Sequence, residues 1–227
     1  MGMNLFSYRS KQPVLLTILA GPFRGARLIL NPACSKRKLF GVYEHILNPW
    51  LNQIIPNIEV VWDVGANDGY FTYGCAHAIK RYHNEGYIIA FEPALAQQSG
   101  LSIPATLPQY NGINFEFIPL FVGAVSNNST ITLNNAYQAR PSLHSKPSLI
   151  KVDVEGAEIE VLKGASLLLK NPHHWVVEVH GDHLLEPVLN FFANAKRLVN
   201  IHPPKPHWLL GSESRTIKTS WVTTQLD

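Results

Sequence analysis

The sequence predicts an α/β protein with a largely parallel sheet and helices on both of its faces. Short apolar runs, typical of strands buried on both sides, alternate along the chain with segments of helical periodicity. Acidic residues or glycines stand at the ends of four of these runs. In parallel sheets the strand ends are where ligands bind, so the same residues predict a site.

Composition favours one globular domain with a short appendage. The chain has 227 residues, 46% hydrophobic and 15% charged. We place an N-terminal hairpin and helix in residues 1–56 and the main domain in residues 57–227. A net charge of +3 without long basic runs argues against nucleic acid as a partner. No apolar stretch predicts a membrane span, and two isolated cysteines are typical of a cytoplasmic protein.

The N-terminal segment is expected to form a hairpin followed by a helix. Residues 13–32 contain two β-rich runs separated by the turn-forming sequence GPFRG. Residues 36–56 have apolar side chains at spacings of three and four, from Phe40 to Leu51. This periodicity favours a single helix that Pro56 ends.

The main domain is expected to begin with a buried strand and a helix. The apolar run over residues 59–64 predicts the strand, and the helix opens at Gly69 and stops at residues 84–86, which read Asn-Glu-Gly. The inward face of this helix is expected to consist of Phe71, Cys75, Ala78, Ile79 and Tyr82.

The rest of the chain repeats this alternation. Apolar runs predict strands over 87–93, 115–125, 148–154, 174–180, 196–203 and 216–224, with an extra strand or hairpin arm over 129–135. Periodicity predicts helices over 94–101, 156–169 and 184–195. We expect Pro187 to lie in the first turn of the last helix, where proline is tolerated.

Two glycines follow the first buried strand. Residues 61–71 read VWDVGANDGYF, so Gly65 and Gly69 lie in a loop between the strand and its helix. Missing side chains let a ligand approach the backbone, and the free N–H groups of the helix start face it. A dinucleotide requires the spacing G-x-G-x-x-G, and GANDGY lacks its middle and last glycines. Asp68 also places an anion where a pyrophosphate would lie.

Acidic side chains near this loop suit S-adenosylmethionine, which has an ammonium and a cationic sulphur but no phosphate. Asp63 is placed to accept a hydrogen bond from the ammonium of the cofactor. Glu92 ends the next strand, where it is placed to accept hydrogen bonds from both ribose hydroxyls. Taken alone, either acid is explained as well by capping a helix as by binding a cofactor. The two acids together with the two glycines, in this order on successive strands, favour the cofactor. The expected cofactor-binding residues are Asp63, Gly65, Ala66, Asn67, Gly69, Tyr70, Phe71, Glu92, Pro93, Ala124 and Asp153.

Three segments, VWDVGANDGYF, IIAFEPALAQQSGL and LIKVDVEGAEIEVLKGA, resemble the FkbM family of S-adenosylmethionine-dependent methyltransferases. The third segment is the most specific, and the later WVVEVHGD resembles the family's fifth strand. The resemblance implies a class I, Rossmann-like methyltransferase fold with a mixed sheet of seven strands, the last antiparallel. It also implies O-methylation of a carbohydrate, glycolipid or natural-product acceptor. The stretch 134–148 lacks the acidic, leucine-bearing segment usual in the family.

On the acceptor side, a hydroxyl is a poor nucleophile and needs a base. Asp153 and Glu155, at the end of the fourth strand, and His180, at the end of the fifth, are the candidate catalytic residues. Glu158 near a helix start fits the helix dipole alone. Together with His180 or Asp182, the two strand-end acids also have the donor types that magnesium or manganese binds, although the sequence does not favour a metal.

Two alternatives to methyl transfer remain open from the sequence. The short 134–148 stretch is compatible with a protein that binds S-adenosylmethionine without turnover. A nicotinamide-dependent oxidoreductase would require NADH binding, against which the GANDGY sequence argues. The sequence also leaves open the acceptor, O- versus N-methylation and the oligomeric state.

Overall fold

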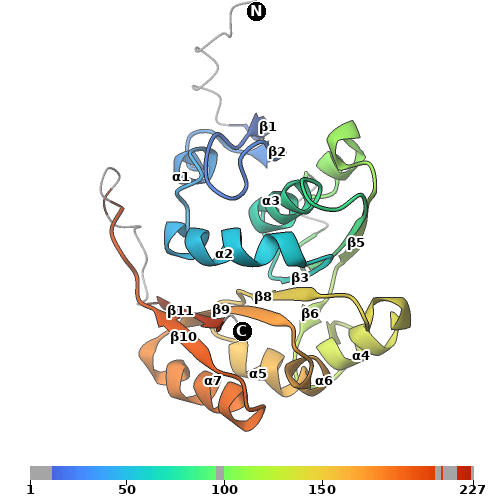
Figure 1. Ribbon diagram of the computed structural model, residues 1–227, viewed down its shortest axis with the longest axis vertical. Coiled ribbons are helices and arrows are strands. Elements are labelled where there is room, and N and C mark those ends of the chain that lie inside the picture. Colours follow the sequence, from blue (N-terminus) through green and yellow to red (C-terminus); the bar gives the residue numbers. More distant parts are fainter. Residues whose placement is uncertain (1–11, 96–99, 208–210, 212–218, 226–227) are drawn as a thin grey trace, which may run out of the picture.

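The central feature of the fold is one mixed sheet of seven strands (Figure 1). The computed structural model describes residues 12–95, 100–207, 211 and 219–225. The strands of the sheet are β3 (Val60–Val64), β4 (Gly86–Phe91), β5 (Ile113–Ile118), β8 (Ser148–Val152), β9 (His174–His180), β10 (Val199–His202) and β11 (Thr219–Thr224). Their spatial order is β10–β11–β9–β8–β3–β4–β5. Only β11 runs antiparallel to its neighbours, which confirms the predicted sheet.

Helices cover both faces of this sheet because its central strands are apolar on both sides. One face carries α2 (Asn48–Ile54) and α3 (Tyr70–Ile79), and the other carries α4 (Leu133–Gln138), α5 (Glu158–Lys163), α6 (Ser166–Lys170) and α7 (Asp182–Asn194) (Figure 1). Along β3, Val61 points into the first hydrophobic cluster, and Val60 and Trp62 point into the second. This alternation is the period-two pattern of a strand buried on both faces.

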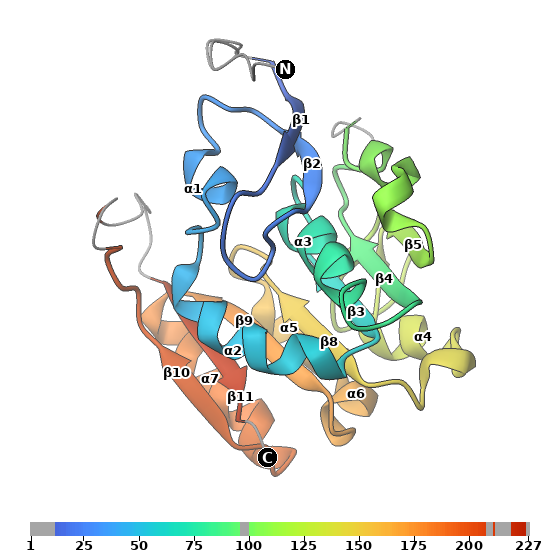
Figure 2. The ribbon, with the colours of Figure 1, turned by 45° about the horizontal axis from the view of Figure 1, so that its top comes forward.

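The N-terminal segment packs on the α3 side of the sheet. The antiparallel hairpin of β1 (Val14–Thr17) and β2 (Arg27–Leu30) is confirmed. Figure 2 shows this hairpin between α1 (Lys36–Leu39) and α3, with α2 lying across the same face. The segment shares one hydrophobic cluster with α3, and the proposed boundary after residue 56 stays a prediction. Short 3-10 helices cover His45–Leu47, Ile55–Asn57, Ile103–Thr106, Pro108–Tyr110 and Pro141–Leu143.

The single helix predicted over 36–56 is wrong. The chain breaks between α1 and α2 at Gly41, whose φ is +66°. A Cβ on Gly41 would lie 1.9 Å from the backbone oxygen of Ala20, so a close approach by the hairpin loop decides the break. Phe40, the first residue of the apolar periodicity, is exposed.

The strand predicted over 115–125 is also wrong, because it divides at Pro119. β5 ends at Ile118, and β6 (Phe121–Val122) pairs with β7 (Thr130–Ile131) in a separate two-stranded sheet. Proline has no N–H to continue the ladder. The extra strand predicted over 129–135 is correspondingly short, since Thr132 caps α4 by accepting from the Asn135 N–H at 3.0 Å.

Further differences concern helix ends and single side chains. The helix predicted over 156–169 divides into α5 and α6 at Gly164, where a Cβ would lie 2.2 Å from the Gly123 backbone oxygen. Helix α7 begins at Asp182, which places Pro187 in its second turn rather than its first. Tyr82 lies beyond α3 and is exposed.

Two predicted elements extend beyond the described part of the chain. Residues 96–99 of the helix predicted over 94–101, and residues 216–218 of the last strand, lie outside it. The strand predicted over 196–203 is confined to β10. In the described ranges, no helix combines the length and the apolar character that crossing a membrane requires.

His173, a buried histidine just before β9, makes stability depend on pH. Burial, with the charges of Arg197 and His174, lowers the pKa of His173 to about 4. The unfolded chain therefore binds the proton first, and the free energy of unfolding falls as the pH drops from about 6.5 towards 4. We expect the wild type to lose about 2 kcal/mol more than His173→Gln between about pH 7.5 and about pH 5. Urea unfolding at both pH values measures this, and equal losses would contradict it.

Candidate functional site

The loop between β3 and α3 lies directly against the end of β8. Gly65, Asn67 and Gly69 all have left-handed backbones, with φ of +84°, +48° and +81°. A Cβ on Gly65 would lie 1.9 Å from the backbone oxygen of Asp153. The first glycine is thus required by the neighbouring strand end itself.

Lys151, on β8, links this loop to the strand ends. Its buried Nζ lies 3.1 Å from Asp153 Oδ2 and 3.6 Å from Asp63 Oδ1, and it donates to the Gly65 backbone oxygen at 3.3 Å. Burial by itself would lower the pKa of Lys151, but the charges of Asp153 and Asp63 outweigh it and raise the pKa. The lysine therefore remains protonated and holds both strand ends together.

Asp63 is fully buried beneath the loop. Its Oδ2 accepts a 2.5 Å hydrogen bond from Thr72 Oγ1, near the start of α3. Burial raises the pKa of Asp63, and the charge of Lys151 and the Thr72 hydrogen bond oppose this rise. Asp63 thus anchors β3 to α3, and its role towards an ammonium group stays a prediction.

Glu92, directly after β4, clamps the outer side of the glycine loop. Its Oε2 accepts from the Asn67 N–H, and its Oε1 accepts from the Ala94 N–H, both at 2.9 Å. An ionised carboxylate offers about four acceptor positions, so two hydrogen bonds leave capacity for hydroxyl donors. The side chain is held in place but not saturated.

A small pocket lies over the loop and is covered by the N-terminal segment. Its lining consists of Lys38, Tyr43, Glu44, Gly65, Ala66, Asn67, Asp68, Tyr70, Phe71, Lys151 and Asp153. Lys38 Nζ pairs with Asp68 Oδ2 at 2.6 Å and lies 4.8 Å from the Tyr43 ring centre. The acid that argued against a pyrophosphate is therefore neutralised by the covering segment.

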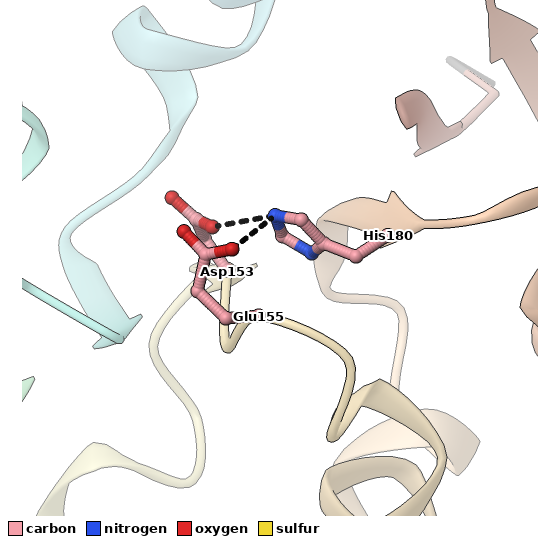
Figure 3. Close-up of side chains that lie close together, drawn as sticks. All are labelled: Asp153, Glu155 and His180. Carbon is pink, nitrogen blue, oxygen red and sulfur yellow. Dashed lines mark ion pairs between the residues drawn. The ribbon is translucent and has the colours of Figure 1, made fainter. Parts of the chain in front are cut away.

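The three candidate catalytic residues come together beside this pocket (Figure 3). His180 Nε2 lies 3.7 Å from Asp153 Oδ1 and 3.4 Å from Glu155 Oε2. Behind the ring, Glu158 Oε1 accepts from His180 Nδ1 at 2.6 Å. Burial lowers the pKa of His180, but the Glu158 hydrogen bond and the charges of Asp153, Glu158 and Glu155 raise it overall. Glu158 is fully buried, so it orients the imidazole in addition to facing a helix start.

Other predicted residues lie apart from this cluster. Ala124 follows β6, whose neighbour Gly123 packs against Gly164 between α5 and α6. Pro93 follows Glu92 in a turn. Asp182 is the first residue of α7 and is not part of the described group of ligand atoms around His180. The roles of Ala124 and Pro93 towards a cofactor stay predictions.

Sequence reasoning missed Lys151, the covering residues Lys38, Tyr43 and Glu44, and the pairing of Glu158 with His180. A signal existed for Lys151, because a lysine inside an apolar run that forms a buried strand needs nearby acids. No local signal marks the cover, since Lys38 precedes Asp68 by 30 residues.

Comparison with known proteins finds a family that part of this chain resembles. Residues 121–198 match the family model described as the methyltransferase FkbM domain. The match includes Asp153, Glu155 and His180, and it confirms the resemblance to the FkbM family.

A curated relative also matches this chain. It is the hexuronic acid methyltransferase AglP of Haloferax volcanii, which is 29% identical over 157 residues. The alignment covers 61% of this chain and 63% of the relative, so less than two thirds of that protein is represented.

Two solved structures show that this chain shares the fold of methyltransferases. Methyltransferase FkbM from Methylobacillus flagellatus KT superposes with a TM-score of 0.51 at 15% identity, covering 74% of this chain and 44% of that one. A SAM-dependent methyltransferase from Agrobacterium tumefaciens superposes with a TM-score of 0.55 at 9% identity, and the superposition covers 94% of this chain and 70% of that one. The predicted class I, Rossmann-like fold is confirmed.

Replacing Lys151 tests how strongly the site depends on one buried charge. Lys151→Met leaves Asp63 and Asp153 without their cation, and we expect a loss of about 3–5 kcal/mol in the free energy of unfolding. The matched control Lys163→Met removes an exposed pair with Glu160 and should cost about 0–1 kcal/mol. Urea unfolding measures both.

Adding Asp63→Asn to Lys151→Met should restore part of the loss, because it removes one of the uncompensated carboxylates. A Lys151→Met protein as stable as the Lys163→Met control would show that the buried cation does not hold these strands together.

Proposed function

We propose that this protein transfers a methyl group from S-adenosylmethionine to a hydroxyl oxygen of a carbohydrate, glycolipid or natural-product acceptor. One observation carries the proposal. A glycine loop and an acid–histidine cluster lie at the same sheet edge, and Lys151 contacts both, through the Gly65 oxygen and Asp153. The match to the FkbM methyltransferase domain and the relative named as a hexuronic acid methyltransferase support the same chemistry.

The residues around the loop fit this cofactor. Glu92 retains acceptor capacity for ribose hydroxyls, and Lys38, in the segment that covers the loop, is paired with Asp68 rather than directed at a phosphate. Tyr70 and Phe71, both buried, line the pocket and exclude water from it. When bound, the cofactor supplies a methyl group on a positively charged sulphur.

The acceptor side has the groups that hydroxyl activation requires. An acceptor hydroxyl must lose its proton as its oxygen becomes alkylated. His180 Nε2 faces Asp153 and Glu155, while Glu158 holds Nδ1 and thereby fixes which nitrogen faces the acceptor. We also propose a cytoplasmic location, because neither described cysteine forms a disulfide.

Cofactor binding is tested by calorimetry with S-adenosylmethionine, S-adenosylhomocysteine and NADH. We expect both adenosyl ligands to bind and NADH not to bind. Glu92→Gln should weaken both adenosyl ligands by about tenfold, or about 1.4 kcal/mol, because it removes a charged acceptor of hydroxyl hydrogen bonds.

The matched control for this experiment is Glu85→Gln, an exposed acid at the opposite end of β4. It should leave the affinities unchanged. NADH binding with no adenosyl binding would contradict the methyltransferase proposal and favour an oxidoreductase.

Acceptor chemistry is tested by transfer of a labelled methyl group to a panel of sugars that includes hexuronic acids. A hexuronic acid offers hydroxyls, which need activation, and a carboxylate, which is already ionised at neutral pH. We expect the label to resist mild alkali, as an ether does, and His180→Gln to lower kcat by about 100-fold or more.

His183→Gln, an exposed histidine three residues further on, is the control and should retain kcat. Loss of the label in alkali would show ester formation and contradict hydroxyl methylation. Cofactor binding without transfer to any acceptor would favour the alternative, a methyltransferase-like protein without turnover.

A further inference from the structure

We infer that Asp153, Glu155 and His180 bind one hard divalent cation, Mg²⁺ or Mn²⁺, on the acceptor side of the site. The inference rests on the proposed function, because this cation holds the acceptor oxygen. The sequence did not favour a metal here. The arrangement of the three side chains, and the residue behind His180, reverse that interpretation.

The ligand atoms of the three residues converge. His180 Nε2, a carboxylate oxygen of Asp153 and one of Glu155 all lie within 4.8 Å of one another. The imidazole nitrogen is 3.7 Å from Asp153 Oδ1 and 3.4 Å from Glu155 Oε2. With bonds of about 2.1 Å, octahedral coordination places neighbouring ligands about 3 Å apart and opposite ones about 4.2 Å apart. The observed spacings need only small side-chain adjustments to meet these values.

The orientation of His180 is the independent sign of a ligand. Its side chain is more than nine-tenths buried, and Nδ1 donates to the fully buried Glu158. Nε2 makes no hydrogen bond among the described contacts, yet it points between two carboxylates (Figure 3). A carboxylate holding the far nitrogen of an imidazole is the usual outer support of a metal-binding histidine.

The charge balance around the cluster also calls for a cation. Asp63, Asp153, Glu155 and Glu158 contribute four carboxylates, and Lys151 is their one lysine partner among the described ion pairs. Lys151 is already shared by Asp63 and Asp153. A divalent cation offsets the remaining negative charge and allows an acidic acceptor to enter a site that otherwise repels it.

A second group of acids competes for the same ion. Glu44, Asp153 and Glu178 also have carboxylate oxygens within 4.8 Å of one another. Both glutamates are buried and the group contains no imidazole. In contrast, the Glu155 side chain is 85% exposed, so a cation beside it retains open positions for water and an acceptor. There the cation would lower the pKa of the acceptor hydroxyl, whose proton would leave through the second oxygen of the exposed Glu155 carboxylate. His180 would then hold the cation instead of taking the proton itself.

The test is a titration of the chelator-treated, desalted full-length protein with Mn²⁺, with free Mn²⁺ followed by electron paramagnetic resonance. We expect one saturable site. His180→Ala and Glu155→Ala should each weaken binding by about tenfold or more, and Glu158→Gln by about tenfold although it does not contact the ion. Glu160→Ala, an exposed acid on the same helix as Glu158, is the matched control and should bind like the wild type.

Calorimetry with S-adenosylmethionine on the same samples separates the two proposals. Normal cofactor affinity in His180→Ala shows that the variant is folded. If the wild type binds S-adenosylmethionine but shows no Mn²⁺ site up to millimolar concentrations, only the metal inference is overturned. If the wild type does not bind S-adenosylmethionine, the proposed function is overturned. Mn²⁺ binding that survives His180→Ala and Glu155→Ala but disappears in Glu178→Gln also overturns the inference, because it places the ion in the second group.

Discussion

The arrangement of the whole site depends on one buried charge, the ammonium of Lys151. A lysine within a central strand is costly to bury, and this one is tolerated because Asp63 and Asp153 lie within 3.6 Å of it. Through its contact with the Gly65 oxygen, the same side chain also holds the glycine loop. The glycine loop and the cluster of Asp153, Glu155 and His180 are therefore positioned by one shared ion-pair network rather than by two separate ones.

Close backbone contact is the second constraint. The Asp153 carbonyl packs where a side chain on Gly65 would lie, so the loop and the end of β8 can meet only with glycine at this position. Of the four described non-glycine residues with a left-handed backbone, Glu44, Asn67 and Glu155 are at this site. Such conformations persist where surrounding contacts determine them, and they gather at functional sites.

Side chains from distant segments complete the site on both sides of Lys151, at the glycine loop and at the cluster of Asp153, Glu155 and His180. The segment that covers the loop precedes it in the chain, and Lys38 attaches to the loop through Asp68. On the other side, Glu158 at the start of α5 fixes the ring of His180 at the end of β9. The site is a convergence of strand ends, as parallel sheets provide, with orientation supplied by the helices that follow them.

The sequence by itself determined the sheet, because apolar runs of strand length are a local pattern that burial on both faces requires. It also determined the glycine loop, Glu92 and the cluster of Asp153, Glu155 and His180, since their positions at strand ends follow from the alternation of strands and helices. Only the tertiary structure decided where helices break, as at Gly41 and Gly164, because the crowding atoms belong to Ala20 and Gly123. It likewise decided the partners of Lys151 and Glu158. These are contacts between residues far apart in the chain, and local periodicity carries no information about which distant atom will approach.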